Sequence, residues 1–180
     1  INMGMISYVK QEIEVIRERD PAIKSNMEVF LYPSFKVILS YRVAHKLYLK
    51  KHYFWARWIS QRAARKTGIE IHPGATIGKG LFIDHGTGVV IGQTAVIGNH
   101  VRLYQGVTLG AKNFTLDEEG LPLDVPRHPI IEDQVTIYSN ASILGRITIG
   151  HGSVIGGNIW LTHSVPPNSK VLQTRAVEGE

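Results

Sequence analysis

Apolar residues in the first third of the chain recur every three or four positions, which is the spacing of amphipathic helices. Three such stripes predict helices from about residue 5 to residue 66. The stripes are Ile6, Val9, Ile13 and Ile16; then Phe35, Ile38, Leu39, Val43 and Leu47; and then Trp55, Trp58, Ile59 and Ala63.

Two local signals predict where these helices begin and end. Asp20 followed by Pro21 is a typical helix start, with Asp20 as the N-cap and Pro21 at the first helical position. Gly68 follows the third stripe, and we expect it to cap the last helix because glycine readily adopts the left-handed conformation.

From residue 71 the hydrophobic period changes to six. A six-residue repeat is typical of a solenoid in which three short strands make one coil, whereas a β-sandwich would alternate with period two. The general crossover rule for parallel strands favours a right-handed coil. Thirteen positions follow the period, all Ile or Leu, and they predict a little over four coils: Ile71, Ile77, Ile83, Ile91, Ile97, Leu103, Leu109, Ile131, Ile137, Ile143, Ile149, Ile155 and Leu161.

The repeat is interrupted twice. A two-residue insertion separates Ile83 from Ile91, and residues 110–130 separate Leu109 from Ile131. The longer interruption contains three consecutive acidic residues and three prolines, so it predicts an excursion loop outside the solenoid. Loops of this length on a compact scaffold are often functional.

Charge follows the same division. Residues 1–68 hold 13 Lys and Arg against 5 Asp and Glu, a balance of +8, whereas residues 69–180 hold 7 against 10, a balance of −3. We therefore expect a helical domain at 1–68, a solenoid domain at 69–167 and a C-terminal tail at 168–180.

The absence of cysteine excludes a disulfide scaffold, a thiolate zinc site and a cysteine nucleophile. No apolar run reaches the roughly 18 residues that a membrane span needs, and no signal-peptide pattern opens the printed sequence. These observations lead us to expect a cytoplasmic protein.

Several motifs in the chain resemble those of the hexapeptide-repeat acyltransferases, and most closely those of the serine O-acetyltransferase family. The resemblance covers about residues 15–167. The segments that carry it are Arg17-Glu18-Arg19-Asp20-Pro21-Ala22, Ser40-Tyr41-Arg42-Val43-Ala44-His45, Ile71-His72-Pro73-Gly74-Ala75, Asp84-His85-Gly86-Thr87-Gly88 and Arg127-His128-Pro129.

The resemblance implies an all-α N-terminal region followed by a left-handed parallel β-helix, in place of the right-handed coil that the general rule favours. It also implies a homotrimer with active sites in the clefts between neighbouring solenoids. In the family the helical regions often join two trimers into a hexamer. The helical region here is shorter than in many members, so trimer and hexamer both stay open.

The expected reaction is transfer of an acetyl group from acetyl-CoA to the hydroxyl of L-serine, giving O-acetyl-L-serine for cysteine biosynthesis. A hydroxyl attacking a thioester needs a base, and a histidine titrates near working pH. His85 is the candidate base, and the resemblance puts Glu70, where many relatives have Asp, as its acidic partner. Without a cysteine, direct attack is simpler than a covalent enzyme intermediate.

L-Serine carries both an ammonium and a carboxylate. Arg127 can grip the carboxylate with two parallel hydrogen bonds, with His128 beside it, and Asp20 and Asp84 can bind the ammonium. The family pattern puts all four residues in the serine pocket. It also puts coenzyme A in the groove between two solenoids, and no metal ion is expected. By position, the expected CoA contacts are Gly110, Ala111, Ser139 and Gly157.

Three other functions share parts of this pattern. The same fold can acetylate a sugar or antibiotic hydroxyl, which is the nearest alternative. A zinc hydratase of the γ-carbonic anhydrase type needs two histidines five residues apart, and the chain has no such pair. A structural trimer without catalysis is disfavoured by the intact His85 motif.

The helical region also carries a basic segment that is a candidate partner surface. The run from Arg42 to Lys66 holds eight Lys or Arg and no acid, interleaved with aromatic residues. It fits a membrane surface or nucleic acid, but a helix surface at an oligomer interface is favoured, so we expect neither partner. Relatives that bind O-acetylserine sulfhydrylase do so through a tail ending in isoleucine. This chain ends at Glu180, so that complex is not expected.

Overall fold

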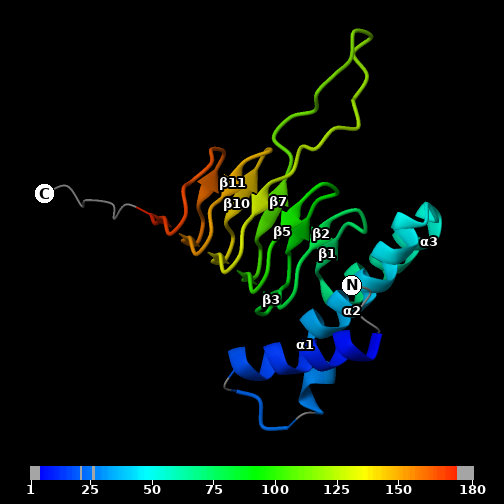
Figure 1. The fold of residues 1–180 in the computed structure, drawn as a ribbon, viewed down its shortest axis with the longest axis vertical. Coiled ribbons are helices and arrows are strands. Elements are labelled where there is room, and N and C mark those ends of the chain that lie inside the picture. Colours follow the sequence, from blue (N-terminus) through cyan, green and yellow to red (C-terminus); the bar gives the residue numbers. More distant parts are fainter. Residues whose placement is uncertain (1–4, 21, 26, 174–180) are drawn as a thin grey trace, which may run out of the picture.

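The computed structural model describes residues 5–20, 22–25 and 27–173. The chain begins with three α-helices and a short 3₁₀ helix: α1 (Met5–Arg19), η1 (Glu28–Leu31), α2 (Pro33–Leu49) and α3 (Tyr53–Thr67). α2 packs against α3 along most of its length, and α1 crosses near the other end of α2 (Figure 1). The helical region expected from the hydrophobic spacing is therefore present.

The first two stripes are only partly buried: Ile16 and Ile38 lie in the core, but Val43 is 37% exposed. The third stripe lies on a helix as predicted, but its tryptophans are not buried. Trp55 and Trp58 are about half exposed. α3 instead buries a row of small side chains, Ala56, Ser60, Ala63 and Thr67. Small residues at this spacing let two helices approach closely, so the bulky indoles point away from α2.

The helix predicted to start at Asp20 is also absent. α1 ends at Arg19, residues 22–25 are not helical, and the carboxylate of Asp20 accepts a hydrogen bond from the N–H of Ala22 at 2.8 Å. Asp20 therefore closes a local turn instead of capping a helix; Pro21 lies outside the described residues. The Gly68 prediction is confirmed, because this residue has φ = 71° and its N–H reaches the carbonyl of Ala64 at 2.8 Å.

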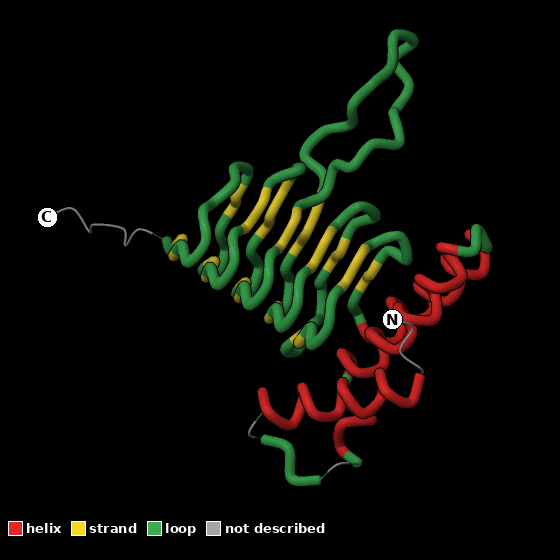
Figure 2. Tube along the Cα trace, viewed as in Figure 1, coloured by secondary structure: helices red, strands yellow, loops and turns green. Residues whose placement is uncertain are grey.

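The rest of the described chain is a solenoid of short parallel strands (Figure 2). Three sheets form its faces, with strand orders β1-β4-β7-β10-β13, β11-β8-β5-β2 and β14-β12-β9-β6-β3. We call them sheets 1, 2 and 3. The strands are β1 (Glu70–Ile71), β2 (Thr76–Ile77), β3 (Phe82–Ile83), β4 (Val90–Ile91), β5 (Val96–Ile97), β6 (Arg102–Leu103), β7 (Thr108–Gly110), β8 (Ile130–Ile131), β9 (Thr136–Ile137), β10 (Ser142–Leu144), β11 (Thr148–Ile149), β12 (Val154–Ile155), β13 (Trp160–Leu161) and β14 (Lys170–Val171).

The six-residue period is confirmed as the inward-facing core of this solenoid. All thirteen positions are at most 7% exposed. Successive coils stack in register, so that Ile91 pairs with Leu109 and Leu109 with Ile143 in sheet 1. Each strand is too short to bury an apolar face by itself, and the stack above and below supplies that burial. β14 continues sheet 3 within the segment that the sequence predicted as a tail.

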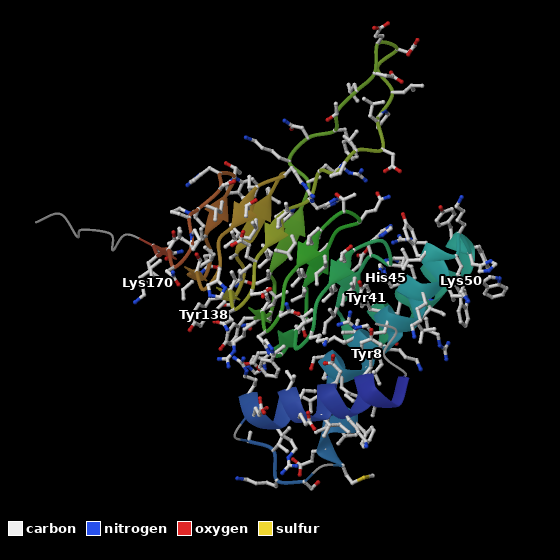
Figure 3. The ribbon with its side chains drawn as sticks, viewed as in Figure 1. Tyr8, Tyr41, His45, Lys50, Tyr138 and Lys170 are labelled. Carbon is white, nitrogen blue, oxygen red and sulfur yellow. The ribbon has the colours of Figure 1, made fainter. Side chains whose placement is uncertain are left out.

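Side chains of α2 fasten the helical region to the first coil (Figure 3). The hydroxyl of Tyr41 donates to the carbonyl of Ala75 at 2.5 Å, and Nδ1 of His45 lies 2.8 Å from the carbonyl oxygen of Pro73. The buried guanidinium of Arg42 donates to the carbonyl of Ile77 at 2.6 Å. These contacts set where the helices stand relative to the solenoid.

Turns connect the sheets at three edges, and the predicted site residues of the solenoid lie at or next to two of them. The 3–1 edge holds the turns from sheet 3 to sheet 1, at residues 84–89, 104–107, 138–141 and 156–159. The 1–2 edge holds the turns from sheet 1 to sheet 2, at residues 72–75, 92–95, 111–129 and 145–147. The turn at 111–129 is the predicted excursion, and we call it the arm. It extends away from the solenoid, and its two sides meet at a bridge between Leu116 and Pro122 (Figure 1).

Candidate functional site

The first turn of the 3–1 edge is longer than the turns stacked beneath it. It has six residues, 84–89, where the other three turns have four, because the two-residue insertion lies here. His85 and Gly86 both have positive φ, 56° and 88°. A Cβ on Gly86 would lie 2.4 Å from Cδ1 of Ile69, so only glycine fits without a shift. The turn therefore bulges outward, and the side chain of His85 is 75% exposed.

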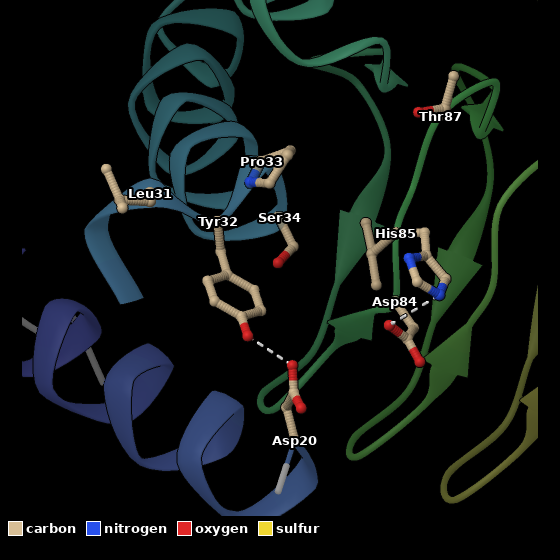
Figure 4. A pocket seen from close by; sticks show the side chains of 9 residues that line it. Asp20, Leu31, Tyr32, Pro33, Ser34, Asp84, His85 and Thr87 are labelled. Carbon is tan, nitrogen blue, oxygen red and sulfur yellow. Dashed lines mark hydrogen bonds and ion pairs between the residues drawn. The ribbon is translucent and has the colours of Figure 1, made fainter. Parts of the chain in front are cut away.

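A pocket of about 480 Å³ lies between this turn and the helical region (Figure 4). Asp20 reaches it from the end of α1, Tyr32 from the start of α2, and Asp84 and His85 from the solenoid. The Tyr32 hydroxyl donates to Asp20 Oδ2 at 2.5 Å, and Asp84 Oδ1 lies 3.9 Å from His85 Nε2. The lining residues are Asp20, Leu31, Tyr32, Pro33, Ser34, Ile83, Asp84, His85 and Thr87.

The charge of this pocket is negative. The hydrogen bond from Tyr32, and then that from the Ala22 N–H, lower the pKa of the Asp20 carboxyl. The same bond raises the pKa of Tyr32 to about 12. Asp20 is therefore ionised and oriented at neutral pH, and no Lys or Arg is among the lining residues. The two carboxylates can bind a small cationic ligand, and the exposed imidazole beside them can accept a proton from a neighbouring group of that ligand.

Glu70, predicted as the partner of His85, opens β1, where it pairs with Val90. Its side chain is half-buried. Within the described part of the chain, no hydrogen bond or ion pair joins Glu70 to His85, and the carboxylate that lies near the imidazole is that of Asp84.

Arg127 and His128 lie at the 1–2 edge, where the arm returns to the solenoid. One threonine organises both: the Thr94 hydroxyl accepts the N–H of Arg127 at 2.9 Å and the N–H of His128 at 3.1 Å, and lies 2.8 Å from Nδ1 of His128. A Cβ on Gly92 would lie 1.9 Å from the imidazole, so the missing side chain of Gly92 makes room for the ring.

His128 is only 7% exposed. Burial, and then the neighbouring Arg127 and Arg146, lower its pKa. The imidazole is therefore neutral at pH 7. A neutral imidazole acts as a hydrogen-bond donor from one nitrogen and an acceptor from the other, which suits a binding role better than a fixed positive charge.

Three groups surround the guanidinium of Arg127. Nη2 donates to Oε1 of Gln93 at 2.8 Å, Nη1 lies 3.9 Å from Oδ1 of Asp124, and the ring centroid of Phe114 is 5.3 Å from Cζ. Sequence reasoning missed these residues, and it missed Tyr32 and Thr94. None of them belongs to the six-residue apolar pattern, so the pattern could not point to them. Their contacts join positions that are 3 to 34 residues apart, and these form only when the chain folds.

Most of the predicted site residues lie at one of two edges of the solenoid. Asp84, His85, Ser139 and Gly157 occupy turns of the 3–1 edge. Ser139 and Gly157 are stacked neighbours there: a Cβ on Gly157 would lie 3.1 Å from the Ser139 carbonyl oxygen. Ala111, Arg127 and His128 lie at the 1–2 edge, and Gly110 ends β7 immediately before it. The pocket that contains His85 therefore does not include Arg127.

Two further results concern the described residues as a group. No three of their His, Asp or Glu side chains are arranged to hold a metal ion. No helix among them is long and apolar enough to cross a membrane. Glu180, on which the expectation about the sulfhydrylase complex rests, lies outside the described residues.

No family model matches the chain. The curated serine acetyltransferase of Bacillus subtilis is 49% identical to it over 165 residues, which are 91% of this chain and 72% of that protein. The chain belongs to the serine acetyltransferase family. The plasmid serine acetyltransferase of Synechococcus elongatus is 54% identical over 158 residues, 87% of this chain and 50% of that protein.

Solved serine acetyltransferases have the same fold. Isoform 3 of Entamoeba histolytica, in complex with cysteine, has a TM-score of 0.86 at 41% identity, covering 98% of this chain and 60% of that one. The soybean enzyme complexed with serine has a TM-score of 0.85 at 37% identity, covering 96% and 68%. The Brucella abortus enzyme in complex with coenzyme A has a TM-score of 0.85 at 34% identity, covering 96% and 66%. The chain thus spans between half and three fifths of the Synechococcus and Entamoeba proteins.

Proposed function

We propose that the chain is a serine O-acetyltransferase, which transfers acetyl from acetyl-CoA to the L-serine hydroxyl and gives O-acetyl-L-serine for cysteine biosynthesis. The observation that carries the proposal is the pocket in which the exposed His85 lies beside Asp84 and across from Asp20. Family membership and the serine, cysteine and coenzyme A bound by solved relatives support it.

In this proposal His85 is the general base. The serine oxygen forms a bond to the thioester carbonyl carbon while its proton passes to His85. The carbon–sulfur bond then breaks, and His85 returns the proton to the leaving thiolate, so CoA leaves as the thiol. Glu70 is assigned to orient the imidazole. No metal takes part.

The charges around the two edges match the two ends of the amino acid. Asp20 and Asp84 bind the ammonium in the acidic pocket, because a primary ammonium has three donors and no acceptor. Arg127 and His128 bind the carboxylate. Acetyl-CoA lies in the same groove against Gly110, Ala111, Ser139 and Gly157.

The division of these residues supports an active site made by two copies. If the 3–1 edge of one chain faces the 1–2 edge of its neighbour, His85 and Arg127 come to one pocket, and the CoA residues to one groove. Such a head-to-tail contact closes into a ring. We propose a homotrimer of left-handed β-helices. A molar-mass measurement in solution separates this trimer from a dimer of trimers joined through the helical regions.

The remaining assignments follow from these. Residues 1–68 form the helical domain, which supplies Asp20, residues 69–167 form the catalytic β-helix, and residues 168–180 form the C-terminal tail. The basic run of α2 and α3 is assigned to contacts between copies, with no nucleic acid and no membrane as partner. A cytoplasmic location fits the use of acetyl-CoA.

The test of the reaction is a thiol-release assay with acetyl-CoA and a panel of acceptors: L-serine, L-homoserine, a hexose and water alone. We expect release well above the water rate with L-serine. Release with the hexose but not with L-serine would favour the sugar-acetylating alternative and refute the proposal.

The shared site has a test of its own. We expect His85→Ala and Arg127→Ala each to be nearly inactive alone. After unfolding together and refolding at equal amounts, random trimers place an intact His85 opposite an intact Arg127 at about a quarter of interfaces. Recovery of about that fraction of activity is expected. If both residues serve one chain's own site, mixing recovers nothing.

A further inference from the structure

The guanidinium of Arg127 lies over an aromatic ring from the arm. Its Cζ lies 5.3 Å from the ring centroid of Phe114, within the range of a cation–π contact. Phe114 is itself 60% exposed, whereas the Arg127 side chain is only 20% exposed. An exposed phenylalanine on a loop adds little to a core, so its contact with the guanidinium is the feature that needs explaining.

The N–H donors of the same guanidinium are only partly occupied by hydrogen bonds within the protein. Gln93 takes a hydrogen bond from Nη2, and Asp124 stands at a loose 3.9 Å from Nη1. A guanidinium has five N–H donors in one plane, so donors are left for a ligand. Two parallel bonds to a carboxylate form only when that plane has the right orientation.

We propose that Phe114 is a positioning residue for Arg127, whose ring holds the guanidinium plane ready for the carboxylate of the amino-acid acceptor. The inference rests on the proposed function, in which Arg127 binds that carboxylate. It gives the arm a part in acceptor binding, because Phe114 and Asp124 both belong to residues 111–129.

The aromatic ring is the chemical requirement. Its negatively charged face attracts the cation and its flatness matches the guanidinium plane. Leucine fills similar space without either property, whereas tyrosine keeps both. The effect should therefore follow aromaticity and not side-chain volume.

The experiment compares three variants in steady-state kinetics with acetyl-CoA and L-serine. Phe114→Leu removes the aromatic face, Phe114→Tyr keeps it, and Leu121→Ala is a control on the same arm, where Leu121 is 62% exposed. For Phe114→Leu we expect the KM for L-serine to rise about 5-fold, with kcat and the KM for acetyl-CoA within about 2-fold of wild type. The other two variants should match wild type.

Each contrary result overturns the inference. The contrary results are that Phe114→Leu matches wild type, that Phe114→Tyr loses as much as Phe114→Leu, or that the KM for acetyl-CoA rises in step with that for L-serine. The proposed function is judged separately by the wild-type protein. If wild type acetylates L-serine and Phe114→Leu is normal, only the inference falls; if wild type does not acetylate L-serine, both fall.

Discussion

Glu12 is a buried carboxyl on α1, the helix that ends next to Asp20. It is 1% exposed, and its Oε2 has no hydrogen-bond partner. Burial raises its pKa from 4.5 to about 7, although the nearby Arg42 acts in the opposite direction. Arg42 itself lies over the Tyr8 ring, with its Cζ 5.2 Å from the ring centroid, and the Lys46 ammonium lies 5.7 Å from the same centroid.

The raised pKa has a defined consequence for stability. The folded state holds the proton of Glu12 more tightly than the unfolded chain does, so this group's contribution is complete below pH 4.5 and is lost as the pH rises to about 7. At about 1.36 kcal/mol per pH unit, the loss is about 3 kcal/mol. Glu12→Gln cannot ionise, so its free energy of unfolding, relative to wild type, should increase by about that amount between pH 4.5 and pH 8.

Urea unfolding followed by circular dichroism measures this difference, at matched ionic strength and a fixed protein concentration, because assembly also adds to stability. Glu14→Gln is the matched control, since Glu14 lies on the same helix and is exposed. The free energy of unfolding of Glu14→Gln, relative to wild type, should not change with pH. A constant difference between Glu12→Gln and wild type across this range would refute the reasoning.

Three further substitutions probe the candidate site. His85→Ala should lower kcat by about 10²–10⁴-fold in the thiol-release assay while the melting temperature stays near wild type, because the side chain is exposed. Gly92→Ala places a Cβ 1.9 Å from the His128 ring; it should raise the KM for L-serine and cost about 1–3 kcal/mol in urea unfolding, and unchanged values for both would contradict the crowding. Tyr32→Phe removes the hydrogen bond to Asp20 and should raise the KM for L-serine about 3–10-fold. An unchanged KM would contradict the proposal that Asp20 binds the serine ammonium.

The repeat shows how far local pattern reaches. Ile91, Leu109 and Ile143 belong to the six-residue repeat that the spacing alone reveals, and they stack in one sheet with almost no exposure. Spacing predicts burial here because a coil is a local structure. Each inward position is determined by its own six-residue repeat, and the next coil has the same pattern. The interruption at 110–130 was found for the same reason, as a place where the rule stops.

The helical region shows where local pattern ends. Trp55 and Trp58 fit an apolar stripe, but α2 selects the small face of α3 because close packing of two helices needs small side chains. Asp20 has the sequence context of a helix cap, but its carboxylate bonds to Tyr32 and to the N–H of Ala22. Hydrophobic periodicity cannot rank such competing partners.

By itself, the sequence determined the solenoid, its buried Ile and Leu rows, the two interruptions and the set of polar residues worth testing. Those features depend on neighbours within a few positions or on a repeat that regenerates itself. Only the tertiary structure decided which residues share a space, Asp20 with Asp84 and Arg127 with Phe114, and that the predicted site residues lie at two different edges. Such contacts join distant segments, and they are settled by how helices, coils and arm pack together.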